Sequence, residues 1–257
     1  MDFSLNREQE LIRKMITEFT ENEVKPIAAE IDRTHEFPAE NIQKMFKLGI
    51  MGMTVPREYG GAGADQVSAA IVTEELAKAC ASTSDIVAGH TLCCVPILEH
   101  GTEEQKRKYL PMLTKGGVLG GMGITEPNAG SDASKSQTEA RLEGDHYVIN
   151  GAKIFITNGP EAGVFVIFAM TDKSKGTKGL SAFIIESSFP GFSVGKVEKQ
   201  DGSARRPHLR DRIHRHDRTK GEPAGSGGQG LQDLHADAGC GPYRHSRAGA
   251  GHCRGAP

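Results

Sequence analysis

Apolar residues recur at helical spacing through the first part of the chain. The first apolar stripe runs from Leu5 to Phe19, and Pro26 is expected to end or bend this helix before the stripe resumes over 27–31. The same spacing predicts further helices over residues 38–49, 64–80, 84–99 and 102–113. The last of these begins with TEEQ, which has the spacing of a capping box. The chain is therefore predicted to open with a helical domain.

Beyond Gly116 the apolar pattern takes the period of strands. Residues 118–124 are too short and too Gly-rich for a helix, whereas 140–142 and 147–151 flank an EGD turn and are typical of a hairpin. Further strands are predicted over residues 154–157, 164–168 and 181–185. Helices followed by strands predict an α+β architecture, with a helical domain over 1–116 and an antiparallel sheet or barrel over 117–200.

The composition changes at about residue 200. Residues 1–200 hold 15 Lys and 6 Arg, whereas residues 201–257 hold 1 Lys and 9 Arg, with 6 of the 10 His and 11 of the 32 Gly. This tail has only four large aliphatic residues. They are too few to offset the roughly 1 to 2 kcal/mol per residue that ordering a backbone costs. We therefore expect residues 201–257 to be disordered.

Charge and cysteine content exclude several classes of protein. A net charge of -2 over 257 residues gives no positive field for nucleic acid or an anionic membrane. No apolar run reaches the roughly 18 to 20 residues of a membrane span, and the N-terminus lacks the regions of a signal peptide. Five cysteines, an odd number, form neither a disulfide framework nor a CxxC metal pattern. These features predict a cytoplasmic protein without a metal site.

The segment over residues 123–132, GITEPNAGSD, carries the first candidate chemistry. It is a strand end that runs into a small turn rich in hydroxyl groups. Backbone NH groups freed there, together with Thr125 and Ser131, could hold the polar edge of a ligand or a phosphate. The alternative is a turn in which Ser131 and Asp132 only satisfy local backbone groups. Residue chemistry alone leaves both interpretations open.

The same segment resembles the first signature of the acyl-CoA dehydrogenase family, and its neighbours follow in the order of that family. PREYGG at 56–61, GTEEQK at 101–106 and GAKIFITN at 151–158 are similar to three further family patterns. The resemblance covers about 200 residues and depends on several independent motifs. One departure is Lys135, which stands where the signature usually ends in a small residue.

The resemblance implies that FAD binds along residues 122–131. Thr125 and backbone groups would bond the polar edge of the flavin, and Ser131 would lie between FAD and the CoA part of the substrate. Phe155 would stand beside the ring, or be only a core aromatic, and Thr157 would donate its hydroxyl towards the reactive ring nitrogen. Apolar walls exclude water, while fixed donors stabilise the charge of the reduced ring. The implied cofactor-binding residues are Met122, Gly123, Ile124, Thr125, Gly130, Ser131, Phe155, Ile156 and Thr157.

The reaction of the family removes a proton α to a thioester carbonyl and passes a hydride from the β carbon to FAD. The resemblance implies that the carboxylate base comes from a C-terminal helical domain, which this chain lacks. Glu126 belongs to the signature and is interpreted as structural, so no catalytic residue is assigned. The overall pattern is similar to short-chain, butyryl-CoA-type members of fatty acid metabolism. The implied partners are an acyl-CoA substrate, electron-transfer flavoprotein and, in the intact family, a homotetramer.

A change of reading frame accounts for the tail. Members of the family continue from about residue 200 with a KMGIR-like pattern and then VPxxNLLG and GxGF. Residues 219–245, TKGEPAGSGGQGLQDLHADAGCGPYRH, have permissible codons that decode in a shifted frame to VPKENLLGREGKGFKICMQTLDAGRIG. This decoded string strongly resembles the family's continuation. Residues 201–257 are therefore interpreted as out-of-frame translation, and the chain as truncated and catalytically incompetent.

Three interpretations remain. The gene encodes a flavin-dependent member of the acyl-CoA dehydrogenase family, and, compatibly with this, the polypeptide itself is a non-enzymatic fragment with at most weak flavin binding and interfaces prone to aggregation. The third interpretation is an adaptor whose basic tail binds nucleic acid in a salt-sensitive way. The tail also contains histidines that could bind a metal and arginines that could contact phosphate, but out-of-frame translation gives both roles little weight. The Gly-rich run over 225–230 resembles a phosphate loop only in composition, because no strand precedes it and no helix follows it.

Overall fold

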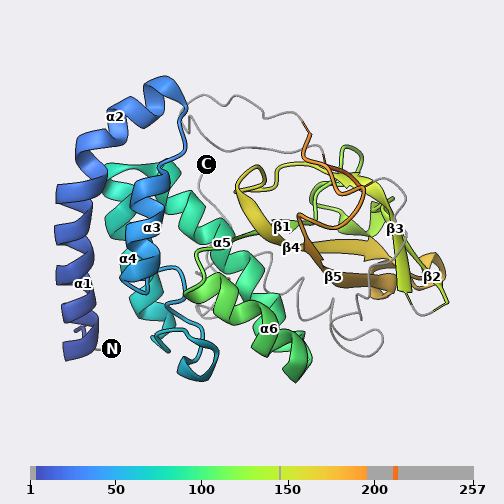
Figure 1. The fold of residues 1–257 in the computed structure, drawn as a ribbon, viewed down its shortest axis with the longest axis horizontal. Coiled ribbons are helices and arrows are strands. Elements are labelled where there is room, and N and C mark those ends of the chain that lie inside the picture. The colour runs from blue at the N-terminus through green and yellow to red at the C-terminus, as the bar shows by residue number, and fades with distance from the viewer. Residues whose placement is uncertain (1–3, 145, 196–210, 214–257) are drawn as a thin grey trace, which may run out of the picture.

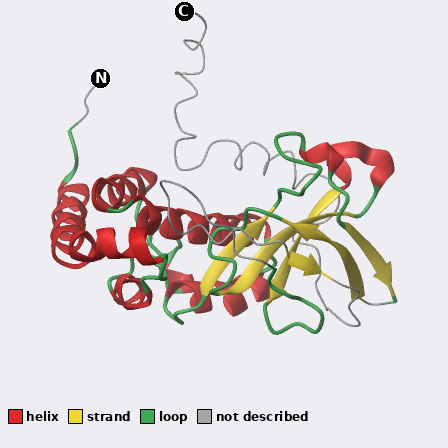
Figure 2. Cartoon of the chain, turned by 90° about the horizontal axis from the view of Figure 1, so that it is seen from above, coloured by secondary structure: helices red, strands yellow, loops and turns green. Residues whose placement is uncertain are grey.

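The computed structural model describes residues 4–144, 146–195 and 211–213. Helices gather on one side of the molecule and strands on the other (Figures 1 and 2). The order is helices first and strands second, as the sequence predicts. The tail over 201–257, expected to be disordered, lies outside the described residues except at 211–213.

Six α-helices form the first half. Asn6 caps α1 with a capping box completed by Gln9. The chain does not leave the helix before Pro26: a π-helical stretch, Thr20–Val24, leads directly into α2, whose first turn accommodates the proline. Thr102 and Gln105 form the predicted capping box at the start of α6. The helices are α1 (Arg7–Phe19), α2 (Lys25–Thr34), α3 (Ala39–Lys47), α4 (Gln66–Ala79), α5 (Ala81–His100) and α6 (Glu103–Thr114).

Six strands follow. The predicted hairpin is present as β2 and β3, antiparallel, with Gly144 at φ 66 in its turn. The sheet is mixed rather than purely antiparallel, because β1 pairs with β4 in parallel, while β4 and β5 are antiparallel. Within the expected disordered segment, β6 pairs with the end of β3. The strands are β1 (Leu119–Gly123), β2 (Glu139–Glu143), β3 (His146–Lys153), β4 (Ala162–Met170), β5 (Leu180–Glu186) and β6 (Asp211–Ile213).

The strand predicted over 154–157 is not formed. β3 already ends at Lys153, and residues 157–161 make a turn. The physical reason is the backbone of Phe155 and Asn158, which adopt positive φ values of 60 and 68. A left-handed residue cannot continue a pleated strand. The apolar run IFIT therefore leaves the sheet instead of extending it.

Helix α5 joins the two halves. It contacts α4 and α6 on one side and β1 and β4 on the other. By length and composition α5 would be able to cross a membrane, and it is the only helix among the described residues that would. The apolar spacing predicts this helix over 84–99, and the structure extends it to Ala81–His100. Its buried face, which includes Ile86, Cys93 and Ile97, lies inside the molecule, as in the core helix of a globular fold.

Candidate functional site

The end of β1 and the segment after β3 lie side by side. The backbone NH of Ile154 donates to the carbonyl of Thr125 over 2.9 Å. Further along, the side-chain amide of Asn158 donates to the carbonyl of Gly120 over 3.2 Å. These bonds bring the two predicted flavin-contacting segments, 122–131 and 155–157, together at one edge of the sheet. Their proximity was not evident from their separation in the sequence.

Phe155 projects from this edge. Its side chain is 54% exposed, which is unusual for a large aromatic, whereas its neighbour Ile156 is fully buried. The side chain of Ile156 fills the space beside Gly121 and Gly123, so any ligand contact of this residue would come from its backbone. Phe155 is therefore not a core aromatic, and its exposed ring is a surface against which a planar group can stack.

Three hydroxyl groups of the predicted site have no hydrogen-bond partner within the part of the chain that the structure describes. They belong to Thr125 and Thr157, which are partly exposed, and to Ser131, which is exposed. Unpaired hydroxyls at an exposed aromatic surface can both donate to and accept from a polar ligand. These residues therefore fit the polar edge of a planar cofactor such as a flavin.

The other predicted site residues have different surroundings. Met122 is half-buried and, like Ile124, packs against the apolar cluster that includes Val164 and Val166 of β4. Gly123 is required by packing, because a Cβ there would lie 2.6 Å from Ile167. Gly130 is exposed, and a Cβ there would meet open space. Lys135, the departure from the family signature, is exposed and pairs with Asp132 over 3.3 Å, so it leaves the base of the turn undisturbed.

Beneath these residues lies a buried ion pair that the sequence analysis did not single out. The ammonium of Lys153 is 2.6 Å from the carboxylate of Glu126, and both side chains are almost inaccessible. The carboxylate also accepts the backbone NH groups of Gln137 and Thr138 over 2.6 and 3.1 Å, and the hydroxyl of Ser136. The interpretation of Glu126 as structural agrees with this arrangement. The missed signal for Lys153 was a lysine at the end of a strand whose middle is apolar.

Both members of the pair have shifted pKa values. Burial alone would raise the pKa of the Glu126 carboxyl, but hydrogen bonds from Lys153 and Ser136 outweigh it and lower that pKa to about 2. Burial lowers the pKa of the Lys153 ammonium, and Glu126 partly offsets the change. The carboxylate is therefore ionised throughout the neutral range and serves as an acceptor, not as a general base.

No group of three or more His, Cys, Asp or Glu side chains able to hold a metal is present among the described residues. The three cysteines that the structure describes are free and buried, and burial raises the pKa of the Cys93 thiol to about 12. A thiol with this pKa is a poor nucleophile and metal ligand.

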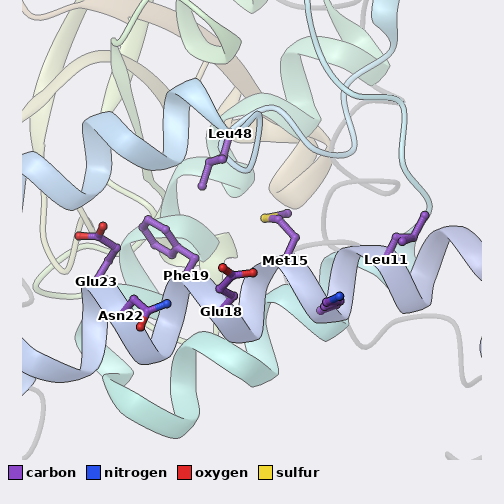
Figure 3. Close-up of a pocket in the computed structure, with 8 residues that line it drawn as sticks. Leu11, Met15, Glu18, Phe19, Asn22, Glu23 and Leu48 are labelled. Atoms are coloured by element: carbon purple, nitrogen blue, oxygen red, sulfur yellow. The ribbon is translucent and has the colours of Figure 1, made fainter.

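A separate groove, lined by both apolar and charged or polar side chains, lies on the helical domain. Figure 3 shows Met15, Phe19 and Leu48 facing one another between α1 and the end of α3. Its volume is about 430 Å³, and Leu11 and Leu48 are 59% and 48% exposed. None of the predicted site residues lines this groove. It is therefore distinct from the edge that carries Phe155.

Comparison with known proteins defines the class. Residues 6–117 match the model of the acyl-CoA dehydrogenase N-terminal domain, and residues 121–212 match that of the middle domain. These consecutive matches, together with the fold and the site, show that the chain belongs to the acyl-CoA dehydrogenase family.

Individual members of the family are similar to this chain in sequence or in structure. The chain is 62% identical over 203 residues to a short-chain-specific acyl-CoA dehydrogenase of Clostridium acetobutylicum, covering 79% of this chain and 54% of the relative. Butyryl-CoA dehydrogenase of Megasphaera elsdenii is similar in structure, with a TM-score of 0.85 and 39% identity, covering 93% of this chain and 64% of that chain. An acyl-CoA dehydrogenase of Bacillus anthracis complexed with FAD has a TM-score of 0.83 and 34% identity, covering 91% and 40%. The chain thus spans about half the length of the curated relative.

Proposed function

We propose that this chain supplies the FAD-contacting half of a short-chain acyl-CoA dehydrogenase. The observation that carries the proposal is the edge formed by exposed Phe155 and by the hydroxyls of Thr125, Ser131 and Thr157, which bond to no other described residue. Bound FAD would supply the acceptor for a hydride from the β carbon of the acyl group. Phe155 would stack on the flavin and exclude water, and the Thr125 and Thr157 hydroxyls would donate to its polar edge. Ser131 lies towards the CoA part of the substrate.

The identity to a short-chain-specific relative and the likeness to a butyryl-CoA dehydrogenase support a short-chain acyl-CoA as substrate. We infer electron-transfer flavoprotein as the electron acceptor, a homotetramer as the intact assembly and the cytoplasm as the location. The carboxylate base is expected outside residues 1–200. By itself the chain is then a flavin-binding fragment without dehydrogenase activity, and we propose this as the second candidate function.

Anaerobic titration with butyryl-CoA separates the two candidates. The purified chain is first titrated with FAD, and binding is followed by quenching of flavin fluorescence. Both candidates require that the chain binds FAD and that the F155A variant binds FAD more weakly. Loss of the flavin absorbance on addition of butyryl-CoA identifies a complete dehydrogenase, whereas bound FAD that stays oxidised identifies the fragment. A chain that binds no FAD contradicts both.

The frame of the tail is tested at the level of the gene. We infer that residues 201–257 are translated out of frame, on the strength of the shifted-frame string that resembles the family's continuation. Sequencing across codons 190–260 is expected to give a corrected frame with VPKENLLG followed by a helical domain. A confirmed base sequence with no such continuation in any frame would refute the frameshift.

A further inference from the structure

The pair of Lys153 and Glu126 differs from the other ion pairs of the described chain in its burial. Lys153 has 0% and Glu126 4% of the side chain exposed. By contrast, Lys25 and Glu21 form a pair of the same 2.6 Å length with 61% and 55% of their side chains exposed. Burying two charges is costly, and well-packed apolar residues of similar volume often stabilise a fold as well or better. Stability alone therefore does not explain this pair.

The contacts of the pair join both ends of one loop to the end of β3. Glu126 accepts the NH groups of Gln137 and Thr138, which close the loop over residues 126–138. Lys153, the last residue of β3, donates to the carbonyl of Ile124 over 3.1 Å and to Ser136 over 3.3 Å. The ammonium thus bonds to the chain just before the loop, at Ile124, and within the last part of the loop, at Ser136. The loop carries Ser131, and Thr125 lies at its entrance.

The same ammonium stands two residues before Phe155. Between them, the NH of Ile154 is held by the carbonyl of Thr125 over 2.9 Å. Two bonds in sequence, from Lys153 to Ile124 and from Ile154 to Thr125, therefore fix the spacing between the end of β1 and the segment that presents Phe155. A one-residue slip of either segment would leave a buried charge unpaired, which is strongly unfavourable.

We propose that Lys153 and Glu126 are positioning residues, which hold Thr125 and Ser131 on the loop in register with Phe155 on the opposite segment. This inference depends on the proposed function only for the identity of the ligand, FAD. The pair touches neither the ligand-facing hydroxyls nor the exposed face of Phe155. It acts through the backbone that carries them, as supporting hydrogen bonds do beneath a preorganised site.

Three variants separate positioning from stability. K153M keeps an unbranched apolar stem and leaves the Glu126 carboxylate buried without its partner, and E126Q keeps the shape of the acceptor without its charge. The double variant E126Q/K153M leaves no lone charge, so it is expected to unfold at a higher temperature than K153M. K25M, which breaks the exposed pair of equal length, is the matched control.

Hydrogen exchange and FAD titration of the full chain are the measurements. In K153M and in the double variant, the amide of Ile154 is expected to exchange about tenfold faster, and FAD to bind about tenfold more weakly, the equivalent of one lost hydrogen bond. Amides of β4 and β5 should keep their rates in the double variant and in K25M. E126Q is expected to speed exchange at Gln137 and Thr138, and the double variant, which leaves no lone charge, serves as the folded variant if K153M does not fold.

The positioning role is supported if the double variant is more stable than K153M but its Ile154 amide still exchanges faster than in wild type. If the pair only stabilised the fold, the double variant would regain both its stability and the slow exchange of Ile154. Exchange at Ile154 within twofold of wild type in the double variant overturns the proposal. If wild type binds no FAD, the proposed function fails, and the positioning role is decided by the exchange rates of Ile154, Gln137 and Thr138 alone. If wild type binds FAD but the double variant binds it equally well, the positioning role fails and the proposed function stands.

Discussion

At the scale of single residues, the turn after β3 is held in a conformation that its sequence disfavours. Phe155 and Asn158 both have positive φ, at 60 and 68, a region that asparagine tolerates but that strains a bulky side chain such as phenylalanine. Asn158 is fully buried, and its amide donates to the carbonyls of Ile86 and Gly120 over 2.9 and 3.2 Å. One side chain therefore ties the turn to α5 and to β1. The strain at Phe155 is maintained by its surroundings and turns the ring outwards.

Replacing Asn158 tests this account. N158A is expected to lower the free energy of unfolding by about 2 to 3 kcal/mol, because two hydrogen bonds are lost and the left-handed backbone becomes costlier. N158G relieves the backbone but also loses the bonds, so it should be less destabilised than N158A. Urea unfolding of the three proteins gives the comparison. Equal stabilities of N158A and wild type would show that the amide does not hold the turn.

His90 gives the fold a dependence on pH. It is fully buried, and its Nδ1 accepts the NH of Gly120 over 2.9 Å, while burial lowers its pKa from 6.5 to about 4. The folded state keeps His90 neutral where the unfolded state binds a proton. Stability is therefore complete above pH 6.5 and falls as the pH drops to 4.

We expect this loss to approach about 3 kcal/mol between those limits. Urea unfolding from pH 7.5 down to 4 should show a flatter profile for H90Q than for wild type. The difference between the two profiles isolates His90 from the other titrating groups. Parallel profiles would mean that His90 is not buried as a neutral group.

At the scale of elements, helices and hairpins could be predicted from local sequence signals, whereas the pairing of distant strands could not. The positions of all six helices and the β2–β3 hairpin follow from periodicity, caps and one glycine turn, which are local properties. The parallel pairing of Leu119 with Ala162 joins residues far apart in sequence, so no local pattern indicates it. The strand predicted over 154–157 was wrong for a tertiary reason, since contacts of Asn158 override the β propensity of IFIT.

In the candidate site, too, some features could be predicted from the sequence and others depend on the fold. The resemblance indicated Thr125, Ser131, Phe155 and Thr157, but their ligand contacts stay predictions. The buried partner of Glu126 depends on folding, because Lys153 lies 27 residues away and is brought close only by the sheet. Residue types predict candidate chemistry, whereas the fold determines which groups remain unpaired.

The packing of α5 against the turn depends on the absence of a side chain at Gly89. A Cβ there would lie 2.6 and 2.7 Å from Cγ2 and Cβ of Thr157. G89A should therefore destabilise the fold by about 1 to 3 kcal/mol, although alanine is the better helix former. Urea unfolding of G89A is compared with that of G130A, the control, in which the added Cβ meets open space. Stabilisation by G89A would show that helix propensity outweighs the contact with Thr157.

At the scale of the whole molecule, the helical and strand regions share their cores. One apolar cluster combines Ile16 and Phe19 of α1 with Phe165 and Ile167 of β4. A second combines Ile97 and Leu113 of the helices with Val164, Val166 and Phe168 of β4. Helix α5 contributes to both clusters, through Ile86 to the first and Cys93 to the second. The two regions are therefore expected to unfold together.

Expression of residues 1–116 alone tests this shared core. Without the sheet, α5 and α6 would expose Cys93, Ile97 and Leu113, which are at most 1% exposed in the whole chain. The fragment is expected to bind the apolar dye ANS and to unfold at a lower temperature and less cooperatively than the full chain, because this surface loses its partners. Far-UV circular dichroism and dye fluorescence, measured on both proteins, provide the readout. If the fragment melts as cooperatively as the full chain and binds no dye, the helices bury their own core. The contacts with the strands would then orient the helices relative to the sheet but contribute little to their stability.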